Sequence, residues 1–219
     1  MQLIDRIEKR RFVGREFLLW LWFESEVFDA TLHTREHGDF GLWLEGRLVL
    51  SLAKESTRIV APNPGLGQEA KAALRRGQLP QSAGLRITIK DTETSLVLDA
   101  ERLGITGLKL NTVLDQGEDE EPPSDLMQEL AGKRPGRAGG KKEQLEDADD
   151  EVFYERMRLT SEVEGVLEAL YRDFLMLRLT EVWDKQVVPA LRRFARGEPL
   201  DAEAYRALLK PKPKRAARG

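Results

Sequence analysis

Apolar residues in the first part of this chain follow the spacing of one strongly buried helix. Residues 12–26 (FVGREFLLWLWFESE) place apolar side chains at positions i, i+1, i+4 and i+5, and further apolar residues fill much of the remaining circumference. A helix that is apolar nearly all round is buried on several sides. We therefore predict a helix that lies under a sheet, or between a sheet and another helix.

Short alternating runs after this helix are typical of strands. They predict a hairpin around Glu45-Gly46-Arg47, a short helix over residues 68–76 that Gly77 ends, and strands over residues 40–44, 48–52, 57–61, 85–89, 95–98 and 105–110. Gly65-Leu66-Gly67 lacks the remaining residues of a phosphate-binding loop, so we interpret it as the entry to the short helix. The pattern indicates an α+β fold. In it, a mainly antiparallel sheet is packed by the apolar N-terminal helix and a long C-terminal helix.

The C-terminal half changes in character, and the chain divides into four segments. Residues 1–114 form the α+β domain, and residues 115–150, with acidic ends and a basic middle, are expected to be a disordered charged linker. Residues 151–199 are expected to be a helical segment that packs on the first domain, with Pro189 near the start of its second helix. Residues 200–219 are expected to be a short helix followed by a disordered basic tail.

Composition excludes several classes of chemistry. The 219 residues include no cysteine and only two histidines, so disulfides, thiolate nucleophiles and zinc fingers are absent. The N-terminus MQLIDRIEKRR is not a secretory signal, and the longest apolar run has seven residues, whereas a membrane span needs about 20. We expect a cytoplasmic protein with no membrane partner, no cofactor and no small-molecule substrate that the sequence can identify.

The two histidines belong to one motif, His33-Thr34-Arg35-Glu36-His37, which matches the H-x-x-E-H pattern of inverted zinc peptidases. That chemistry needs both histidines on one helical face. Here Gly38 and Asp39 follow at once and a strand begins, so we predict a solvated loop and neither a metal site nor an enzyme. A zinc hydrolase that uses His33, Glu36 and His37 is the alternative ranked last.

Basic residues are the more informative candidates for binding. Lys and Arg neutralise phosphates, and the candidate nucleic-acid-binding residues are Arg10, Arg11, Arg75, Arg76, Arg192, Arg193, Lys210, Lys212, Lys214 and Arg215. The alternative is that cations at helix ends complement helix dipoles and that the tail is merely solvated. Because acidic linker blocks offset the basic tail, the net charge of −3 does not exclude a nucleic-acid partner. The four tryptophans could stack bases, but their spacing favours the core.

Residues 12–26 resemble a region of RdgC-like, recombination-associated bacterial proteins, as do the strings Gly46-Arg47-Leu48-Val49-Leu50, Gly107-Leu108-Lys109-Leu110 and Phe153-Tyr154-Glu155-Arg156-Met157. The resemblance implies a nucleoid-associated protein that binds DNA without sequence preference and modulates recombination. The better-known members are longer, so this chain could be a companion subunit or a separated domain, and neither DNA encirclement nor any DNA-binding residue is carried over.

From the resemblance and the basic tail we expect a non-catalytic accessory protein of bacterial DNA recombination or phage-related DNA metabolism, with DNA as its partner. The alternative is a protein–protein interaction or oligomerisation module that uses the C-terminal helix, with another protein or a second copy as its partner.

Overall fold

The computed structural model describes residues 10–90, 92–110 and 140–209, and for residues 10–12, 140–151 and 208–209 it describes the backbone only. The chain divides into two compact units. One contains residues 1–109 and 165–219, and the other contains residues 110–164. The first unit holds the sheet, the apolar helix and the C-terminal helices.

The apolar helix is α2 (Arg10–Val27), and its core position is confirmed. Phe17, Leu21, Trp22 and Phe23 are at most 2% exposed. The helix packs on strands β2 and β4, and aromatic rings from the C-terminal helices cover it on other sides. It therefore lies between the sheet and further helices, as its nearly continuous apolar surface requires.

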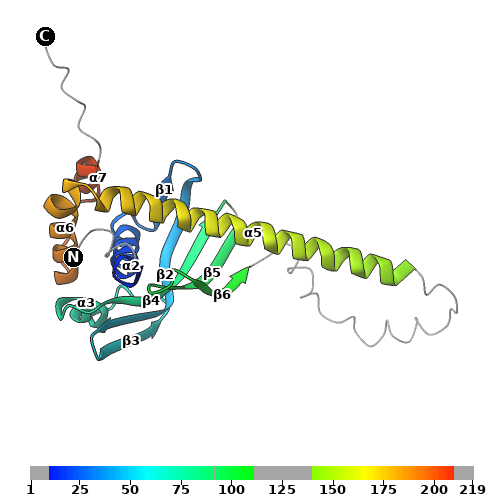
Figure 1. Ribbon diagram of the computed structural model, residues 1–219, viewed down its shortest axis with the longest axis horizontal. Coiled ribbons are helices and arrows are strands. Elements are labelled where there is room, and N and C mark those ends of the chain that lie inside the picture. Colours follow the sequence, from blue (N-terminus) through cyan, green and yellow to red (C-terminus); the bar gives the residue numbers. More distant parts are fainter. Residues whose placement is uncertain (1–9, 91, 111–139, 210–219) are drawn as a thin grey trace, which may run out of the picture. The chain divides into compact units, whose positions relative to one another are not determined.

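The described part of the chain forms one sheet of six strands, which Figure 1 shows beside α2. These are β1 (Thr31–Thr34), β2 (Gly38–Leu52), β3 (Glu55–Ala61), β4 (Leu79–Ile89), β5 (Thr92–Asp99) and β6 (Ile105–Leu110). Strand β2 pairs antiparallel with β1, β3 and β4, and β4 pairs antiparallel with β5, beyond which lies β6. The predicted α+β class with an antiparallel sheet is confirmed.

The predicted hairpin around Glu45-Gly46-Arg47 is wrong, because these residues lie inside one continuous strand, β2. Leu44 pairs with Leu85 and Leu48 with Ala83, so the residues between Leu44 and Leu48 form a bulge. Gly46 has φ +71°, the left-handed value that glycine tolerates. A glycine flanked by alternating apolar runs signals a bulge as well as a turn, and pairing with β4 selects the bulge here.

The helical part is α3 (Gln68–Arg75), α5 (Gly140–Arg178), a π-helical turn (Trp183–Val187), α6 (Val188–Arg196) and α7 (Ala202–Leu209). Pro189 lies in the first turn of α6, where a missing N–H costs nothing. Helix α5 begins at Gly140, so residues 140–150, expected to belong to a disordered linker, are helical. The rest of that linker, residues 115–139, lies outside the described residues, as do residues 111–114 and the tail from Lys210.

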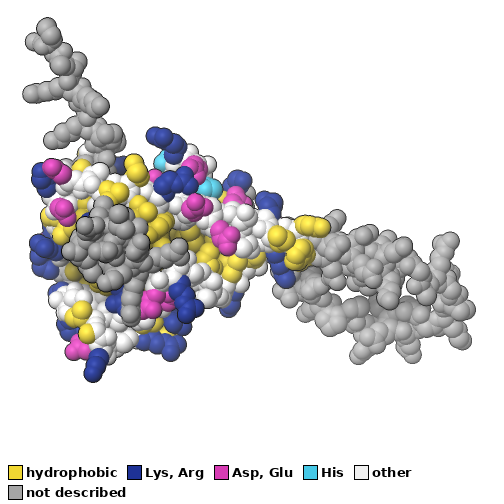
Figure 2. Space-filling model, in the orientation of Figure 1, with side chains coloured by type: hydrophobic (Ala, Val, Ile, Leu, Met, Phe, Trp, Pro, Cys, Tyr) yellow, Lys and Arg dark blue, Asp and Glu magenta, His cyan; other side chains and the backbone are white. Residues whose placement is uncertain are grey.

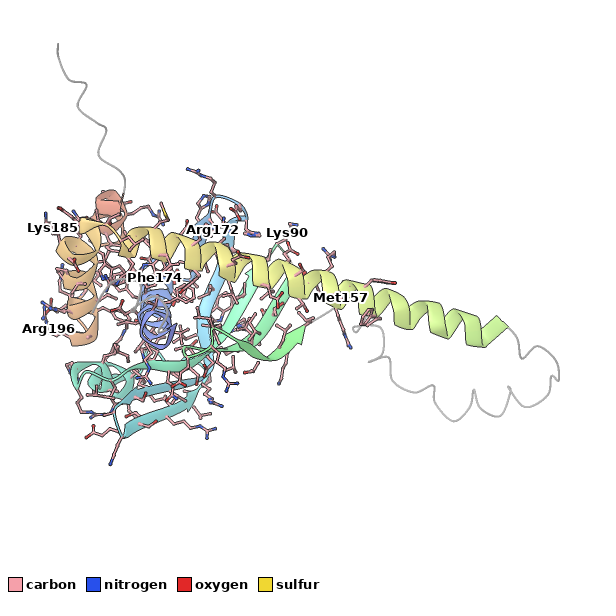
Figure 3. The ribbon with its side chains drawn as sticks, in the orientation of Figure 1. Lys90, Met157, Arg172, Phe174, Lys185 and Arg196 are labelled. Atoms are coloured by element: carbon pink, nitrogen blue, oxygen red, sulfur yellow. The ribbon has the colours of Figure 1, made fainter. Side chains whose placement is uncertain are left out.

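Aromatic rings connect the C-terminal helices to α2 within the first unit. The Phe174 ring of α5 lies 5.4 Å from Phe17 and 5.7 Å from Trp20, and Figure 3 shows it pointing towards α2. The Phe194 ring of α6 meets Phe23 edge-on at 5.3 Å, and the Tyr205 ring of α7 meets the same phenylalanine at 5.0 Å. Three helices that are distant in sequence from α2 thus complete one aromatic core. Among the described residues, no helix is long and apolar enough to cross a membrane.

Candidate nucleic-acid interface

Arg75 and Arg76 lie at the C-terminal end of α3. Arg75 is the last residue of the helix and Arg76 is its C-cap, and both are exposed. At this end the cations also complement the negative pole of the helix dipole, as the alternative interpretation expects. Within the described residues the guanidinium of Arg76 makes no hydrogen bond or ion pair, so its charge is available to an outside partner.

Two more of the sequence-predicted arginines lie on α6. Arg192 and Arg193 are exposed on it, together with Arg196 in its last turn. The Nε atom of Arg193 donates to Glu198 at 3.2 Å, and Arg196 donates to the same carboxylate. The hydrogen bond from Arg196 is the main cause that lowers the pKa of Glu198. One acidic residue thus offsets part of the positive charge, while Arg192 makes no ion pair within the described residues.

Helices α3 and α6 are adjacent, although more than a hundred residues separate them in the sequence. The Nη1 atom of Arg75 donates to the carbonyl oxygen of Ala195 at 3.3 Å. The contact brings the two groups of arginines to adjoining helices, and we call them the arginine cluster: Arg75, Arg76, Arg192, Arg193 and Arg196. Figure 2 shows Lys and Arg side chains along the edge formed by α6, with acidic side chains interspersed. Arg196 points outwards there in Figure 3.

A cavity of about 570 Å³ adjoins the cluster and contains a lysine that the sequence did not single out. The Nζ atom of Lys71 lies 2.8 Å from Glu26 and above the rings of Trp22 and Phe194. Burial lowers the pKa of Lys71 to about 8, against the opposing effect of Glu26. Arg75 and Arg196 line the same cavity, so three cations face it. Lys71 and Arg75 are four residues apart in the predicted helix, so they lie on the same helical face. This spacing was the sequence signal that could have placed Lys71 beside the candidate arginine.

The tryptophans are mostly structural. Trp20, Trp22 and Trp183 are at most 6% exposed, which confirms their prediction as core residues. Trp43 is half-buried on β2, and the guanidinium of Arg86 lies 4.6 Å from its ring. Arg86 also pairs with Glu45 at 3.3 Å. The three buried indoles have no free face on which a base could stack.

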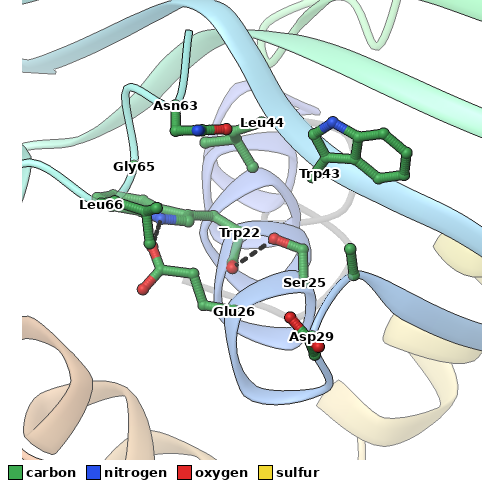
Figure 4. Close-up of a pocket in the computed structure, with 10 residues that line it drawn as sticks. Trp22, Ser25, Glu26, Asp29, Trp43, Leu44, Asn63, Gly65 and Leu66 are labelled. Carbon is green, nitrogen blue, oxygen red and sulfur yellow. Dashed lines mark hydrogen bonds between the residues drawn. The ribbon is translucent and has the colours of Figure 1, made fainter. Parts of the chain in front are cut away.

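Figure 4 shows a second cavity, of about 450 Å³, between α2 and the loop that enters α3. Gly65 lies against the indole of Trp22 there, and a Cβ atom at this glycine would come within 2.4 Å of the indole nitrogen. Helix α3 starts at Gln68 directly after this loop, which confirms that Gly65-Leu66-Gly67 is a helix entry. The cavity contains no residue of the arginine cluster, and it does not extend the candidate interface.

The histidine motif lies on the β1–β2 hairpin and not on a helix. His33 is part of β1, where its Nδ1 atom is 2.8 Å from Asp39 of β2, so the prediction of a loop is wrong for this residue. Glu36 and His37 lie in the turn; Glu36 pairs with Arg172 of α5, and His37 lies beside Gly165. Within the described residues, no group of three or more His, Asp or Glu side chains could hold a metal ion.

Two further candidate arginines, Arg10 and Arg11, begin α2, but the structure does not describe their side chains. The candidate tail residues Lys210, Lys212, Lys214 and Arg215 lie outside the described residues. Of the ten candidates, four are therefore placed with their side chains, and these four belong to the arginine cluster.

Comparisons with protein-family models, with curated proteins and with solved structures find no match to this chain. The resemblance to RdgC-like proteins therefore stays a prediction.

Proposed function

We propose that this chain is a non-catalytic accessory protein of bacterial DNA recombination or phage-related DNA metabolism, and that it binds DNA without sequence preference through the arginine cluster. The observation that carries the proposal is the contact between Arg75 of α3 and Ala195 of α6, which joins two groups of exposed arginines. Guanidinium groups bind phosphate oxygens with two parallel hydrogen bonds, and phosphate contacts carry no sequence information. A cytoplasmic location is part of the proposal, since recombining DNA lies there.

The charge distribution favours a modest number of phosphate contacts. Glu198 neutralises part of the charge on Arg193 and Arg196, whereas Arg76 and Arg192 have no such partner within the described residues. These two arginines are thus the best positions for a test. Each phosphate contact contributes about 0.9 to the slope of log affinity against log salt concentration.

The test is fluorescence anisotropy with two labelled duplexes of unrelated sequence over a salt series. We expect both duplexes to bind with similar affinity, and the double variant Arg76→Gln/Arg192→Gln to lower the salt slope by about 2. The matched control is Arg35→Gln/Arg102→Gln, which removes two exposed arginines from other elements. Equal weakening by the control, or no affinity at low salt, contradicts the proposal.

A second candidate function is self-association through α5. Phe153, Tyr154 and Met157 lie within one turn and a half of this helix and are 57%, 68% and 56% exposed. Large apolar residues gathered on an exposed helix face mark a protein interface. An antiparallel pair of α5 helices centred on residue 155 places Phe153 opposite Met157 of the second copy and Tyr154 opposite Arg156, so the patch is complementary to itself.

Light scattering over a range of protein concentrations tests this second candidate. We expect a dimer that the variant Phe153→Ser/Met157→Ser converts to a monomer, while a substitution of the similarly exposed Leu66 to Ser leaves the dimer intact. A wild-type protein that stays monomeric at high micromolar concentration removes the candidate.

A further inference from the structure

A third cavity, of about 710 Å³, lies among α2, the β1–β2 hairpin, the part of α5 after Gly165, and α7. Its volume is in the range of small-molecule sites, which is about 300–1,000 Å³. Phe28, in the turn that follows α2, and Leu170 and Leu177 of α5 supply apolar walls. None of the residues that line it belongs to the arginine cluster, so its role is independent of the proposed DNA interface.

Carboxyl groups from three elements converge on this cavity. Glu24 comes from α2, Asp39 from β2 and Asp173 from α5, and they face one guanidinium group, that of Arg206. Arg206 lies over the ring of Phe28, 4.7 Å from its centroid, and makes no hydrogen bond to a carboxylate within the described residues. His33 also lines the cavity and pairs with Asp39. With the three carboxyl groups ionised, the lining carries a net negative charge.

Glu24 is the unusual member of this group because it is only 5% exposed. Its Oε1 atom accepts a hydrogen bond of 2.8 Å from the hydroxyl of Tyr205, and no ion pair joins its carboxyl group to a cation in the part of the chain that the structure describes. The indole nitrogen of Trp20, which is also buried and lines the cavity, makes no hydrogen bond of normal geometry either. Burial raises the pKa of Glu24 to about 7, although Tyr205, Trp20 and Arg206 each lower it.

A buried carboxyl group normally has a cation as its partner. Here the residue lines a cavity, has a tyrosine hydroxyl but no cation as its partner among the described residues, and shares the cavity lining with two further carboxyl groups. We propose that the cavity binds a small primary amine with a short apolar body, and that Glu24 is the counter-ion of its ammonium group. The apolar side chains Phe28, Leu170 and Leu177 then contact the body of the ligand, while Asp173 adds to the attraction at long range.

The proposal predicts a pH dependence with a definite sign. An ammonium group binds the ionised form of Glu24, and a carboxyl group with a pKa of about 7 is about one-tenth ionised at pH 6 and about nine-tenths ionised at pH 8. The affinity for an amine therefore rises about tenfold between these two pH values. The other titratable or charged groups that face Glu24 or the cavity are Tyr205 and Arg206 of α7, Asp173 of α5, Asp39 of β2 and His33 of β1, and a His33 variant serves as a separate control.

The experiment is isothermal titration calorimetry of the full chain with cadaverine and phenethylamine at pH 6 and pH 8. Pentanediol and phenylpropanoate are matched neutral and anionic probes. We expect saturable binding of at least one amine, about tenfold tighter at pH 8, and no binding of its matched probe. His33→Gln keeps the pH dependence, whereas Glu24→Gln, which resembles the protonated carboxyl group, loses both binding and pH dependence.

Two aspartates separate a direct effect from a general change in charge. Asp173→Asn is expected to weaken the amine severalfold, while Asp184→Asn, which removes an exposed carboxylate outside the cavity, leaves the affinity unchanged. The proposal is overturned if neither amine binds at millimolar concentration at pH 8, if phenylpropanoate binds more tightly than phenethylamine, or if folded Glu24→Gln keeps the wild-type affinity.

Discussion

The substitution Glu24→Gln is the sharpest probe of the buried core, because it removes one ionisable group and preserves its shape. Burial raises the pKa of Glu24 from 4.5 to about 7. The folded state therefore holds the proton more tightly than the unfolded state. The stabilising effect of the bound proton is complete below pH 4.5 and is lost as the pH rises through about 7.

The size of the loss follows from the two pKa values. One pH unit corresponds to about 1.4 kcal/mol, so the rise to about 7 makes ionisation of Glu24 cost about 3 kcal/mol of folding free energy above neutral pH. A glutamine has no proton to lose, and its carbonyl oxygen can accept the hydrogen bond from Tyr205. We therefore expect Glu24→Gln to be more stable than the wild type at pH 8 by about 3 kcal/mol, and to differ less at pH 5.

Urea unfolding at a series of pH values measures this difference directly. For a chain of this length the gain corresponds to roughly 6–12 °C in Tm at pH 8. The matched control is Glu55→Gln, since Glu55 is exposed on β3 and its carboxyl group stays in water. If the wild type and Glu24→Gln lose stability in parallel between pH 5 and pH 8, burial does not perturb Glu24 and the reasoning is refuted.

Three further substitutions test the packing. Gly84→Ala places a Cβ atom 2.1 Å from the carbonyl oxygen of Glu45 in the β2 bulge. Chemical unfolding should show that the free energy of unfolding falls by about 2–3 kcal/mol or more. A fall below about 0.5 kcal/mol would mean that the bulge moves freely to make room. Phe174→Ala empties a fully buried site between α2 and α5, with an expected loss of about 3–5 kcal/mol and a lower Tm. Arg172→Gln breaks the exposed ion pair with Glu36, and unfolding at low and high salt should differ from the wild type by less than about 1 kcal/mol.

The local pattern of residues was enough to predict those elements whose environment the sequence itself specifies. The apolar residues of α2 require burial on several sides, and the alternation in residues 85–89 requires one face in a core, wherever the remaining chain goes. Pro189 and Gly77 mark helix ends through their own backbone preferences, and α6 and α3 begin or end beside them. Such signals depend on a residue and its near neighbours, and a single sequence contains them.

Other features depend on partners that are distant in the chain. Gly46 suits a turn and a bulge equally, and only the pairing of Leu44 and Leu48 with β4 selects the bulge. Glu24 has the same carboxyl group as the exposed glutamates of α5, and its high pKa arises because the folded chain buries it, against the lowering effect of the hydrogen bond from the distant Tyr205. The candidate interface shows the same division between local signals and distant contacts. The sequence alone determined that Arg75 and Arg76 end one helix and that Arg192 and Arg193 lie on another. Only the tertiary structure decided that these helices adjoin, because that depends on how Phe194 and its helix pack against the aromatic side of α2.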